Sequence, residues 1–103
     1  MLSQFRTYNL AVQFHHECRA IKLPGYLKTQ LLRASSSIAL NLAEGSGKPT
    51  VRDQLRFYSI AMGSLRESQA ALDLAPIRSP KLVALADHLG ASLFKLCRAK
   101  SGL

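Results

Sequence analysis

The sequence predicts an all-α protein, an antiparallel up-down four-helix bundle that occupies residues 1–103 as a single domain. Clusters of Pro and Gly at 23–25, 45–49 and 75–80 divide the chain into four segments. Each segment spans about 18 to 26 residues, which suits a helix and is too long for a strand. Hydrophobic residues make up 48% of the chain, and they recur at steps of three and four, as helices around a shared core require. Short connections between four such helices favour the up-down arrangement.

The first two segments each carry one apolar stripe. The first helix is expected from about Ser3 to Ile21, and the second begins near Pro24 to Tyr26, where proline suits the first turn, and ends at Gly45. The stripe of the first is Leu2, Phe5, Tyr8 and Val12, with His15 a candidate to extend it. The stripe of the second is Leu27, Leu31, Ala34, Ile38 and Leu42.

The last two segments carry clear start signals. Thr50 is expected to cap the third helix, with Asp53 in its first turn, where a carboxylate favours the free N–H groups. Ser79 and Pro80 predict the start of the fourth helix. The stripe of the fourth helix is Val83, Ala86, Leu89 or Gly90, Leu93 and Leu96.

The third helix shows two stripes instead of one. The first is Val51, Leu55, Tyr58, Met62, Leu65 and Leu72. The second consists mostly of small residues: Phe57, Ala61, Ser64, Ser68, Ala71 and Ala75. A second stripe indicates either a central position within a small protein or contact with another subunit. We expect a homo-oligomer, because exposed apolar patches on soluble monomers are usually small.

The charge balance is strongly basic. The chain has 14 Lys and Arg against 6 Asp and Glu, for a formal charge of +8. Its hydrophobic content excludes an intrinsically disordered chain. No apolar run is long enough for a transmembrane helix, the N-terminus lacks a secretory signal pattern, and Cys18 and Cys97 are too few for a disulfide framework. We expect a cytoplasmic protein with reduced thiols and no association with membranes.

Two segments of the sequence carry a family resemblance. Arg33-Ala-Ser-Ser-Ser-Ile-Ala-Leu-Asn-Leu-Ala-Glu-Gly45 and Phe57-Tyr-Ser-Ile-Ala-Met-Gly-Ser-Leu-Arg-Glu67 resemble a bacterial four-helix-bundle family often encoded in intervening sequences of 23S ribosomal RNA genes. The family is similar to the accessory variability determinant of diversity-generating retroelements, a basic pentameric bundle that binds a reverse transcriptase and nucleic acid. The resemblance implies the bundle fold, a homopentamer and a nucleic-acid context.

The up-down topology predicts where the positive charge gathers. The ends of the second and fourth helices share one end of the bundle with the starts of the first and third. Seven basic residues are expected there, namely Arg6, Lys48, Arg52, Arg56, Lys95, Arg98 and Lys100. They face only two acids, Glu44 and Asp53, a difference of +5. Such an end would attract a polyphosphate backbone with little preference for sequence.

A line of polar residues follows one face of the second helix. Arg33, Ser37, Asn41 and Glu44 recur at steps of four, four and three. We interpret this line as a buried structural network that ties the second helix to Arg66 or Glu67 on the third, because buried polar groups need partners. A binding groove is the alternative.

Other kinds of site are excluded or disfavoured. Gly45-Ser46-Gly47-Lys48 resembles a phosphate-binding loop, but Pro49 replaces the required Ser or Thr and no strand precedes it. His15, His16 and Cys18 lack a second ligand pair for a metal, and neither Glu44 nor Glu67 has a histidine three residues on. No signature of nucleophilic catalysis is present. We therefore expect no enzyme activity and no cofactor.

Two hypotheses follow from these observations. The first is a non-catalytic homo-oligomeric bundle, a pentamer by the resemblance, that binds RNA or DNA. Its most specific form is an accessory subunit of a retroelement reverse transcriptase. The second is a protein–protein scaffold whose basic surface meets an acidic or RNA-laden partner.

Overall fold

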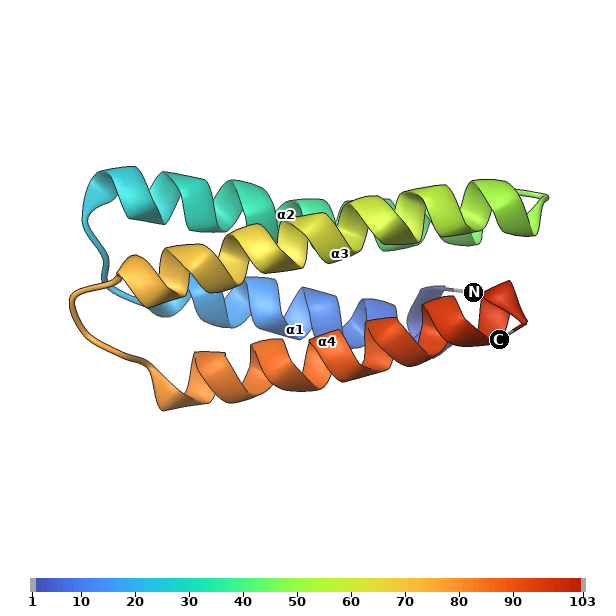
Figure 1. Cartoon of the computed structure of the whole chain (residues 1–103). Coiled ribbons are helices and arrows are strands. Elements are labelled where there is room, and N and C mark those ends of the chain that lie inside the picture. The colour runs from blue at the N-terminus through green and yellow to red at the C-terminus, as the bar shows by residue number, and fades with distance from the viewer. Residues whose placement is uncertain (1, 103) are drawn as a thin grey trace.

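The computed structural model describes residues 2–102 and shows four helices in an up-down bundle (Figure 1). A short 3-10 turn, η1 (Leu2–Gln4), precedes α1 (Arg6–Ala20), α2 (Gly25–Ser46), α3 (Val51–Leu74) and α4 (Pro80–Ser101). The bundle measures 41 × 21 × 20 Å. The predicted fold class is confirmed. Met1 and Leu103, at the limits of the predicted domain, lie outside the described residues.

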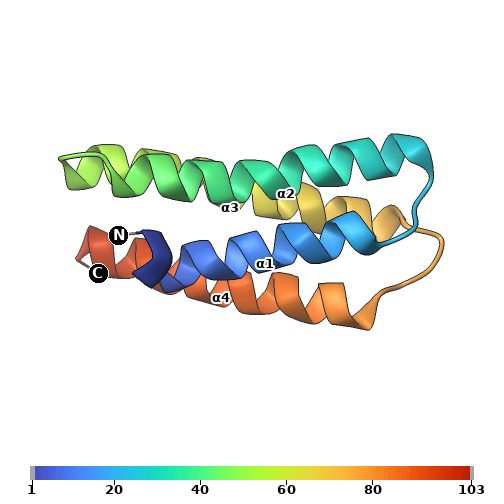
Figure 2. The same ribbon diagram turned by 180° about the vertical axis from the view of Figure 1, so that it is seen from behind.

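Each helix packs against two neighbours, so that α1 and α3 each lie between α2 and α4 (Figures 1 and 2). The 3-10 turn η1, the last turn of α4 and the α2–α3 turn lie together at one end of the bundle, which we call the terminal end. The α1–α2 and α3–α4 connections lie at the opposite end.

The helix boundaries follow the predicted start signals except in α1. The Thr50 hydroxyl accepts a hydrogen bond from the backbone N–H of Asp53 (3.2 Å), and the Ser79 hydroxyl accepts one from the N–H of Leu82 (3.3 Å). The first helix begins at Arg6 instead of Ser3, because the extended backbone of Phe5 separates α1 from the 3-10 turn η1. Lys28 of α2 donates to the carbonyls of Arg19 and Ile21 at the end of α1, where a positive charge is favourable.

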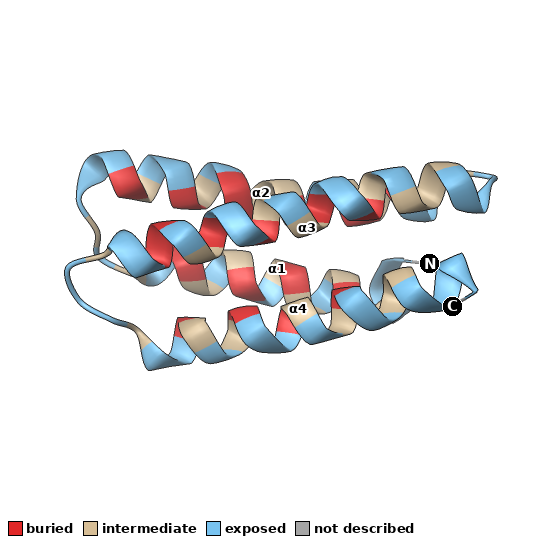
Figure 3. Cartoon of the chain, viewed as in Figure 1, coloured by how far each residue is buried: buried red, intermediate tan, exposed pale blue. Residues whose placement is uncertain are grey.

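The core confirms the predicted stripe of α2 and corrects that of α1 (Figure 3). All five predicted apolar residues of α2 are buried. In α1 the buried positions are instead Thr7, Ala11, Phe14 and Cys18. The large side chains of Phe5 and Tyr8 are only partly buried and pack along the edge of the core. The stripe of α1 that faces the core therefore lies one position before the predicted Tyr8, Val12 and His15, a rotation of about 100°.

The other two helices also depart from their predicted stripes. In α4, Leu82 is buried in place of Val83, alongside Ala86, Leu89 and Leu93. In α3, both predicted stripes contribute to the interior: Tyr58, Leu65 and Leu72 from the first, and Ala61, Ser68 and Ala71 from the second. The second stripe is therefore used largely within the bundle, and most of it is not left for another subunit.

Gly45 sets the separation of α2 and α3 near the terminal end. A Cβ atom on this residue would lie 2.7 Å from Cε1 of Tyr58 and 3.0 Å from Cβ of Phe57. The first distance is shorter than real Cβ contacts and the second is at their tight limit, so α2 can pack this closely only because Gly45 has no side chain. The sequence analysis took Gly45 as the end of the helix, whereas it is a buried position inside the last turn.

Hydroxyl groups join neighbouring helices across the core. A hydrogen bond of 2.7 Å links the hydroxyls of Thr7 in α1 and Ser92 in α4. Another of 2.7 Å links Nδ1 of His15 in α1 to the hydroxyl of Ser35 in α2, which is fully buried. These short side chains satisfy one another while the helices stay in close contact.

Replacing Gly45 by alanine should destabilise the protein. The added methyl group would displace the buried Tyr58 ring, and overpacking of this kind costs about 1–3 kcal/mol. Gly63→Ala is the matched control, because a Cβ atom on this glycine of α3 meets nothing within 4 Å. The control should gain about 0.5–1 kcal/mol from helix propensity. Urea unfolding measures both, and equal effects would contradict this account of Gly45.

The stability of the protein should fall below neutral pH because of His15. Burial, with smaller contributions from His16 and Arg19, lowers the pKa of His15 in the folded protein. The unfolded chain therefore takes up a proton near the ordinary pKa while the folded one resists it, so the free energy of unfolding decreases as the pH falls through this range.

His15→Gln should flatten this pH dependence when unfolding is measured at pH 7.5 and pH 5. The exposed neighbour His16 provides the control, and His16→Gln should retain most of the slope. An unchanged slope in His15→Gln would contradict the assignment.

Candidate nucleic-acid interface

The seven basic residues expected at one end come from elements that meet at the terminal end. Arg6 begins α1, Lys48 lies in the α2–α3 turn, and Arg52 and Arg56 lie in the first two turns of α3. Lys95, Arg98 and Lys100 lie in the last two turns of α4. All except Lys48, which is half-buried, are exposed.

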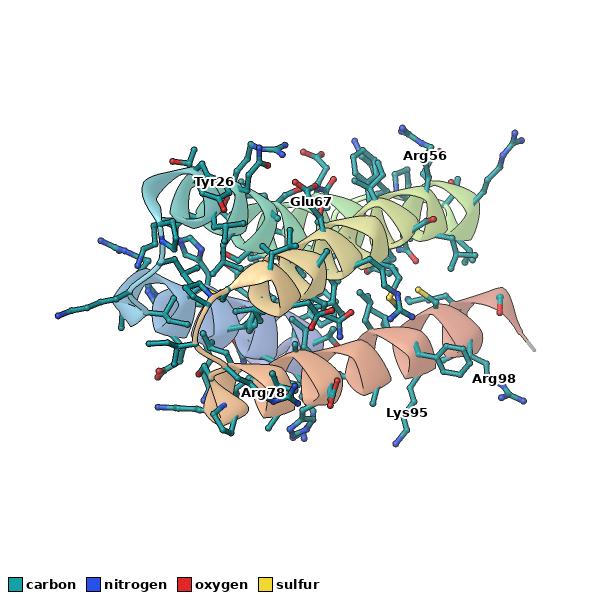
Figure 4. The ribbon with its side chains drawn as sticks, turned by 60° about the vertical axis from the view of Figure 1, so that its left-hand side comes forward. Tyr26, Arg56, Glu67, Arg78, Lys95 and Arg98 are labelled. Atoms are coloured by element: carbon teal, nitrogen blue, oxygen red, sulfur yellow. The ribbon has the colours of Figure 1, made fainter. Side chains whose placement is uncertain are left out.

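These side chains surround the terminal end and do not form one flat patch. Figure 4 shows Arg56 projecting from α3 on the side of the molecule opposite to Lys95 and Arg98 of α4. We call the seven residues the basic collar. A collar of this kind presents positive charge to a ligand from several directions.

On the α1–α4 side, the collar borders a small depression. Arg6 and Lys95 line it together with Ala91 and Ser92, and its volume is about 290 Å³. A hydrogen bond of 3.2 Å between Nη2 of Arg6 and Nε2 of His88 holds the arginine against α4. Two cations therefore flank one opening on this side.

On the α2–α3 side, an aromatic ring orders two members of the collar. The guanidinium carbon of Arg56 lies 4.5 Å from the centroid of the Phe57 ring, and Nζ of Lys48 lies 5.1 Å from it. Both distances are in the range of cation–π attraction. Phe57 was predicted as part of a packing stripe, and the structure shows that it also positions charge.

Few carboxylates neutralise the collar. Of the three ion pairs among residues 2–102, only Lys48 with Glu44 (3.2 Å) lies at the terminal end. Arg52, Lys95 and Lys100 form no hydrogen bond or ion pair with any residue that the structure describes. These three cations can approach an external anion without first breaking an internal contact.

In a comparison against known families, residues 4–80 match the family described as 23S rRNA-intervening sequence protein. The chain belongs to this family. The match covers α1, α2 and α3 and stops at the first residue of α4. The family resemblance seen in the sequence is thereby confirmed. No curated protein matches the chain.

The family match does not cover the whole collar. Arg6, Lys48, Arg52 and Arg56 lie within the matched residues, whereas Lys95, Arg98 and Lys100 lie beyond them. Three of the seven basic residues of the collar therefore lie outside the part of the chain that the family match covers.

The polar line of α2 divides into separate contacts in this family member. Nη2 of Arg33 lies 2.5 Å from Oε2 of Glu67, which ties α2 to α3. The pair is not buried, since the two side chains are 64% and 43% exposed. Surface ion pairs of this kind contribute little to stability. The long side chains of Arg33 and Glu67 meet on the outside of α2 and α3. The prediction that this part of the polar line is buried is therefore wrong.

The middle of the line is partly buried and bridges the same two helices. The Ser64 hydroxyl of α3 donates to the Ser37 hydroxyl (2.9 Å), and Nδ2 of Asn41 donates to the carbonyl of Ser37 (2.8 Å). Glu44 does not join this contact, because its carboxylate pairs with Lys48.

Burial raises the pKa of the Cys18 thiol to about 12 and also raises that of Cys97, so neither sulfur is activated as a thiolate. Among residues 2–102, no group of three His, Cys, Asp or Glu side chains lies close enough to hold a metal ion.

Gly45 and Ser46 are helical, so the segment that resembles a phosphate loop is the end of α2. No helix in the described part of the chain is long and apolar enough to cross a membrane.

The sequence analysis missed one feature of the terminal end. An open cavity of about 490 Å³ lies there, and Phe5, Gln54, Tyr58, Leu96 and Lys100 contribute to its lining. Only Lys100 was named as a site residue. The sequence offered one signal for this cavity. Gln54 lies near the start of α3, and it is a polar residue there that neither caps the helix nor carries a charge.

Proposed function

We propose that this protein is a non-catalytic, homo-oligomeric bundle that binds RNA or DNA through the phosphate backbone. The observation that carries the proposal is the basic collar, in particular the exposed Arg52, Lys95 and Lys100, which have no partner among the described residues. Clustered cations without internal partners bind polyanions by releasing their counterions. Of the six acidic residues of the chain, only Glu44 and Asp53 lie near the collar.

The collar suits recognition of shape and charge. Its members surround an end about 20 Å across. They can therefore contact phosphates on both sides of a groove of a nucleic-acid duplex, or of a folded loop, at the same time. We propose that binding follows backbone charge and shape, because contacts to phosphates carry no sequence information directly. The natural ligand in this proposal is an RNA or DNA with closely spaced phosphates.

In its most specific form, the proposal makes the protein an accessory subunit of a diversity-generating retroelement reverse transcriptase. The family description places the chain with proteins of 23S rRNA intervening sequences, which is a nucleic-acid context. A reverse-transcriptase gene beside its own gene would support the accessory role. A location within a ribosomal RNA gene would support the intervening-sequence setting.

The absence of catalysis is part of the proposal. The two thiols are kept protonated by burial, and the buried Ser35 hydroxyl is bonded to His15 inside the bundle, out of reach of a substrate. Both cysteines are free thiols, in keeping with a reducing cytoplasm.

Homo-oligomerisation finds support on surfaces other than the small-residue stripe of α3. Leu40 of α2 is 68% exposed and Ile60 of α3 is 44% exposed. They lie at the same level of the bundle, between the Ser37–Ser64 contact and the approach at Gly45. Val51 of α3 and Phe94 of α4 are also exposed, and Phe94 lines a groove together with Leu55 and Cys97. A ring such as the proposed pentamer requires two different apolar faces on each subunit.

Binding to nucleic acid should weaken steeply as salt rises, and the collar should set the slope. The double variant Arg52→Ala/Lys95→Ala removes two exposed cations at the terminal end. If each contacts one phosphate, the slope of log K against log salt should decrease by about 1.8 on duplex DNA and about 1.4 on a single strand. Fluorescence anisotropy with labelled RNA and DNA across a salt series measures this change.

Two controls make that measurement specific. Lys22→Ala/Arg78→Ala removes the same charge from exposed residues near the opposite end of the bundle and should change the slope little. Asn41→Leu alters the polar line of α2 and should leave the affinity unchanged. No binding even at low salt would reject the proposal and favour the protein–protein scaffold.

The oligomer should depend on the exposed apolar residues of α2 and α3. Light scattering of the wild-type protein is expected to give a multiple of the chain mass. Leu40→Glu/Ile60→Glu should reduce that mass to one chain while the helical content stays unchanged, because neither side chain is buried in the bundle. Tyr26→Glu, a change at an exposed position near the opposite end, is the control. A wild-type mass equal to one chain would contradict the oligomer.

A further inference from the structure

The open cavity at the terminal end lies inside the ring of positive charge. It is formed by the start of the chain, the last turn of α2, the first turns of α3 and the last turns of α4, and its volume is about 490 Å³. Cavities of about 300–1,000 Å³ are the usual size for binding a small molecule or one part of a larger ligand. The buried positions of α3 begin at Tyr58 and those of α4 end at Leu93, so the cavity remains open beside the outermost turns of these two helices (Figure 3).

The walls of the cavity are aromatic and aliphatic. The rings of Phe5 and Tyr58 lie 6.2 Å apart between centroids, tilted by 59°, and Leu96 of α4 contributes an aliphatic wall. The Tyr58 ring cannot move towards α2, because Gly45 already lies against it. A flat apolar group can therefore pack on a wall that the fold holds in place.

One polar group in the lining lacks a partner. Nε2 of Gln54 donates to the carbonyl of Lys48 (3.0 Å), whereas Oε1 of the same amide is buried and accepts no hydrogen bond. A buried acceptor without a donor costs free energy. A ligand that brings an N–H group into the cavity would supply this donor once the amide turns towards the space that it lines.

A cation completes the lining. Lys100 contributes to the cavity and has no partner among residues 2–102, and Arg52 and Lys48 lie in the neighbouring turns of the collar. The ligand that fits is thus a flat ring with N–H donors that is attached to a phosphate. We propose that the cavity receives an unpaired nucleobase of the bound nucleic acid, with its phosphate beside Lys100.

This inference rests on the proposed function and adds a preference to it. A collar alone would bind paired and unpaired strands according to their charge. A cavity that accepts a base favours a strand in which one base is free to leave the stack, and stacking on aromatic side chains stabilises such a base. The protein would then prefer structured RNA or DNA with a bulged nucleotide over a continuous duplex.

The test compares two RNA hairpins of the same length, one fully paired and one with a single unpaired adenosine in its stem. Adenine offers the amino group that Gln54 lacks. Wild-type protein should bind the bulged hairpin about tenfold more tightly, the size expected for one stacked base. Ser46→Trp, which fills the mouth of the cavity without changing the charge, should abolish the preference and leave the affinity for the paired hairpin unchanged.

Two further variants separate the cavity from its surroundings. Gln54→Leu removes the unpaired acceptor and should reduce the preference for the bulged hairpin. Ser59→Trp adds the same bulk at an exposed position of α3 outside the cavity and should keep the preference. Thermal melting of each variant verifies that it is folded.

The outcomes distinguish the two proposals. Equal, salt-dependent binding of both hairpins by the wild-type protein would overturn the base-binding cavity and leave the collar as the whole interface. A preference that survives in Ser46→Trp would also overturn it, since the base would then bind elsewhere. No binding of either hairpin at low salt would overturn the proposed function and this inference together.

Discussion

The close approach of α2 to α3 at Gly45 is the contact on which the terminal end depends. Because Gly45 has no side chain, Tyr58 and Phe57 of α3 both lie against the last turn of α2. Tyr58 points into the bundle and is 2% exposed, while Phe57 lies on the flank, where Lys48 and Arg56 pack over its ring. Two neighbouring aromatic residues thus serve different purposes. One closes the core and forms a wall of the cavity, and the other positions two cations.

The protein holds its helices together with short hydroxyl side chains and apolar packing, and it uses little of its charge for this purpose. The Thr7–Ser92, His15–Ser35 and Ser64–Ser37 contacts each join two neighbouring helices without long side chains. Clustered positive charge destabilises a folded protein through self-repulsion, so a charge of +8 is a cost unless a ligand relieves it. Because packing and hydroxyl contacts hold the helices together, the bundle can fold although Arg52, Lys95 and Lys100 have no partner among residues 2–102.

Much of the fold could be predicted from the sequence, because some of its signals are local. The stripe of α2 has large aliphatic residues at regular steps, and Thr50, Ser79 and Pro80 mark helix starts by their own chemistry. The stripe of α1 was wrong by one position, since Phe5 and Tyr8 drew the prediction towards the flank of the helix. One position on a helix is a rotation of about 100°. An error of this size changes the direction in which a side chain is expected to face. It does not change the end of the bundle at which that side chain lies.

The same reasoning explains what could be predicted of the site. The up-down topology alone brings the seven basic residues to one end, but their spread around it depends on the rotation of each helix. The cavity is harder to predict, because its lining residues Phe5, Gln54 and Leu96 are far apart in the sequence. Their positions depend on how three parts of the chain pack together. The family match ends at Pro80, so it includes Gly45, Tyr58 and Gln54 but neither Leu96 nor Lys100. The contacts that form the wall of the cavity therefore belong to the matched part of the chain, whereas α4 supplies its opposite wall and its cation. In the proposed mode of binding, α4 can therefore change its charge and its contribution to the cavity without disturbing the approach at Gly45.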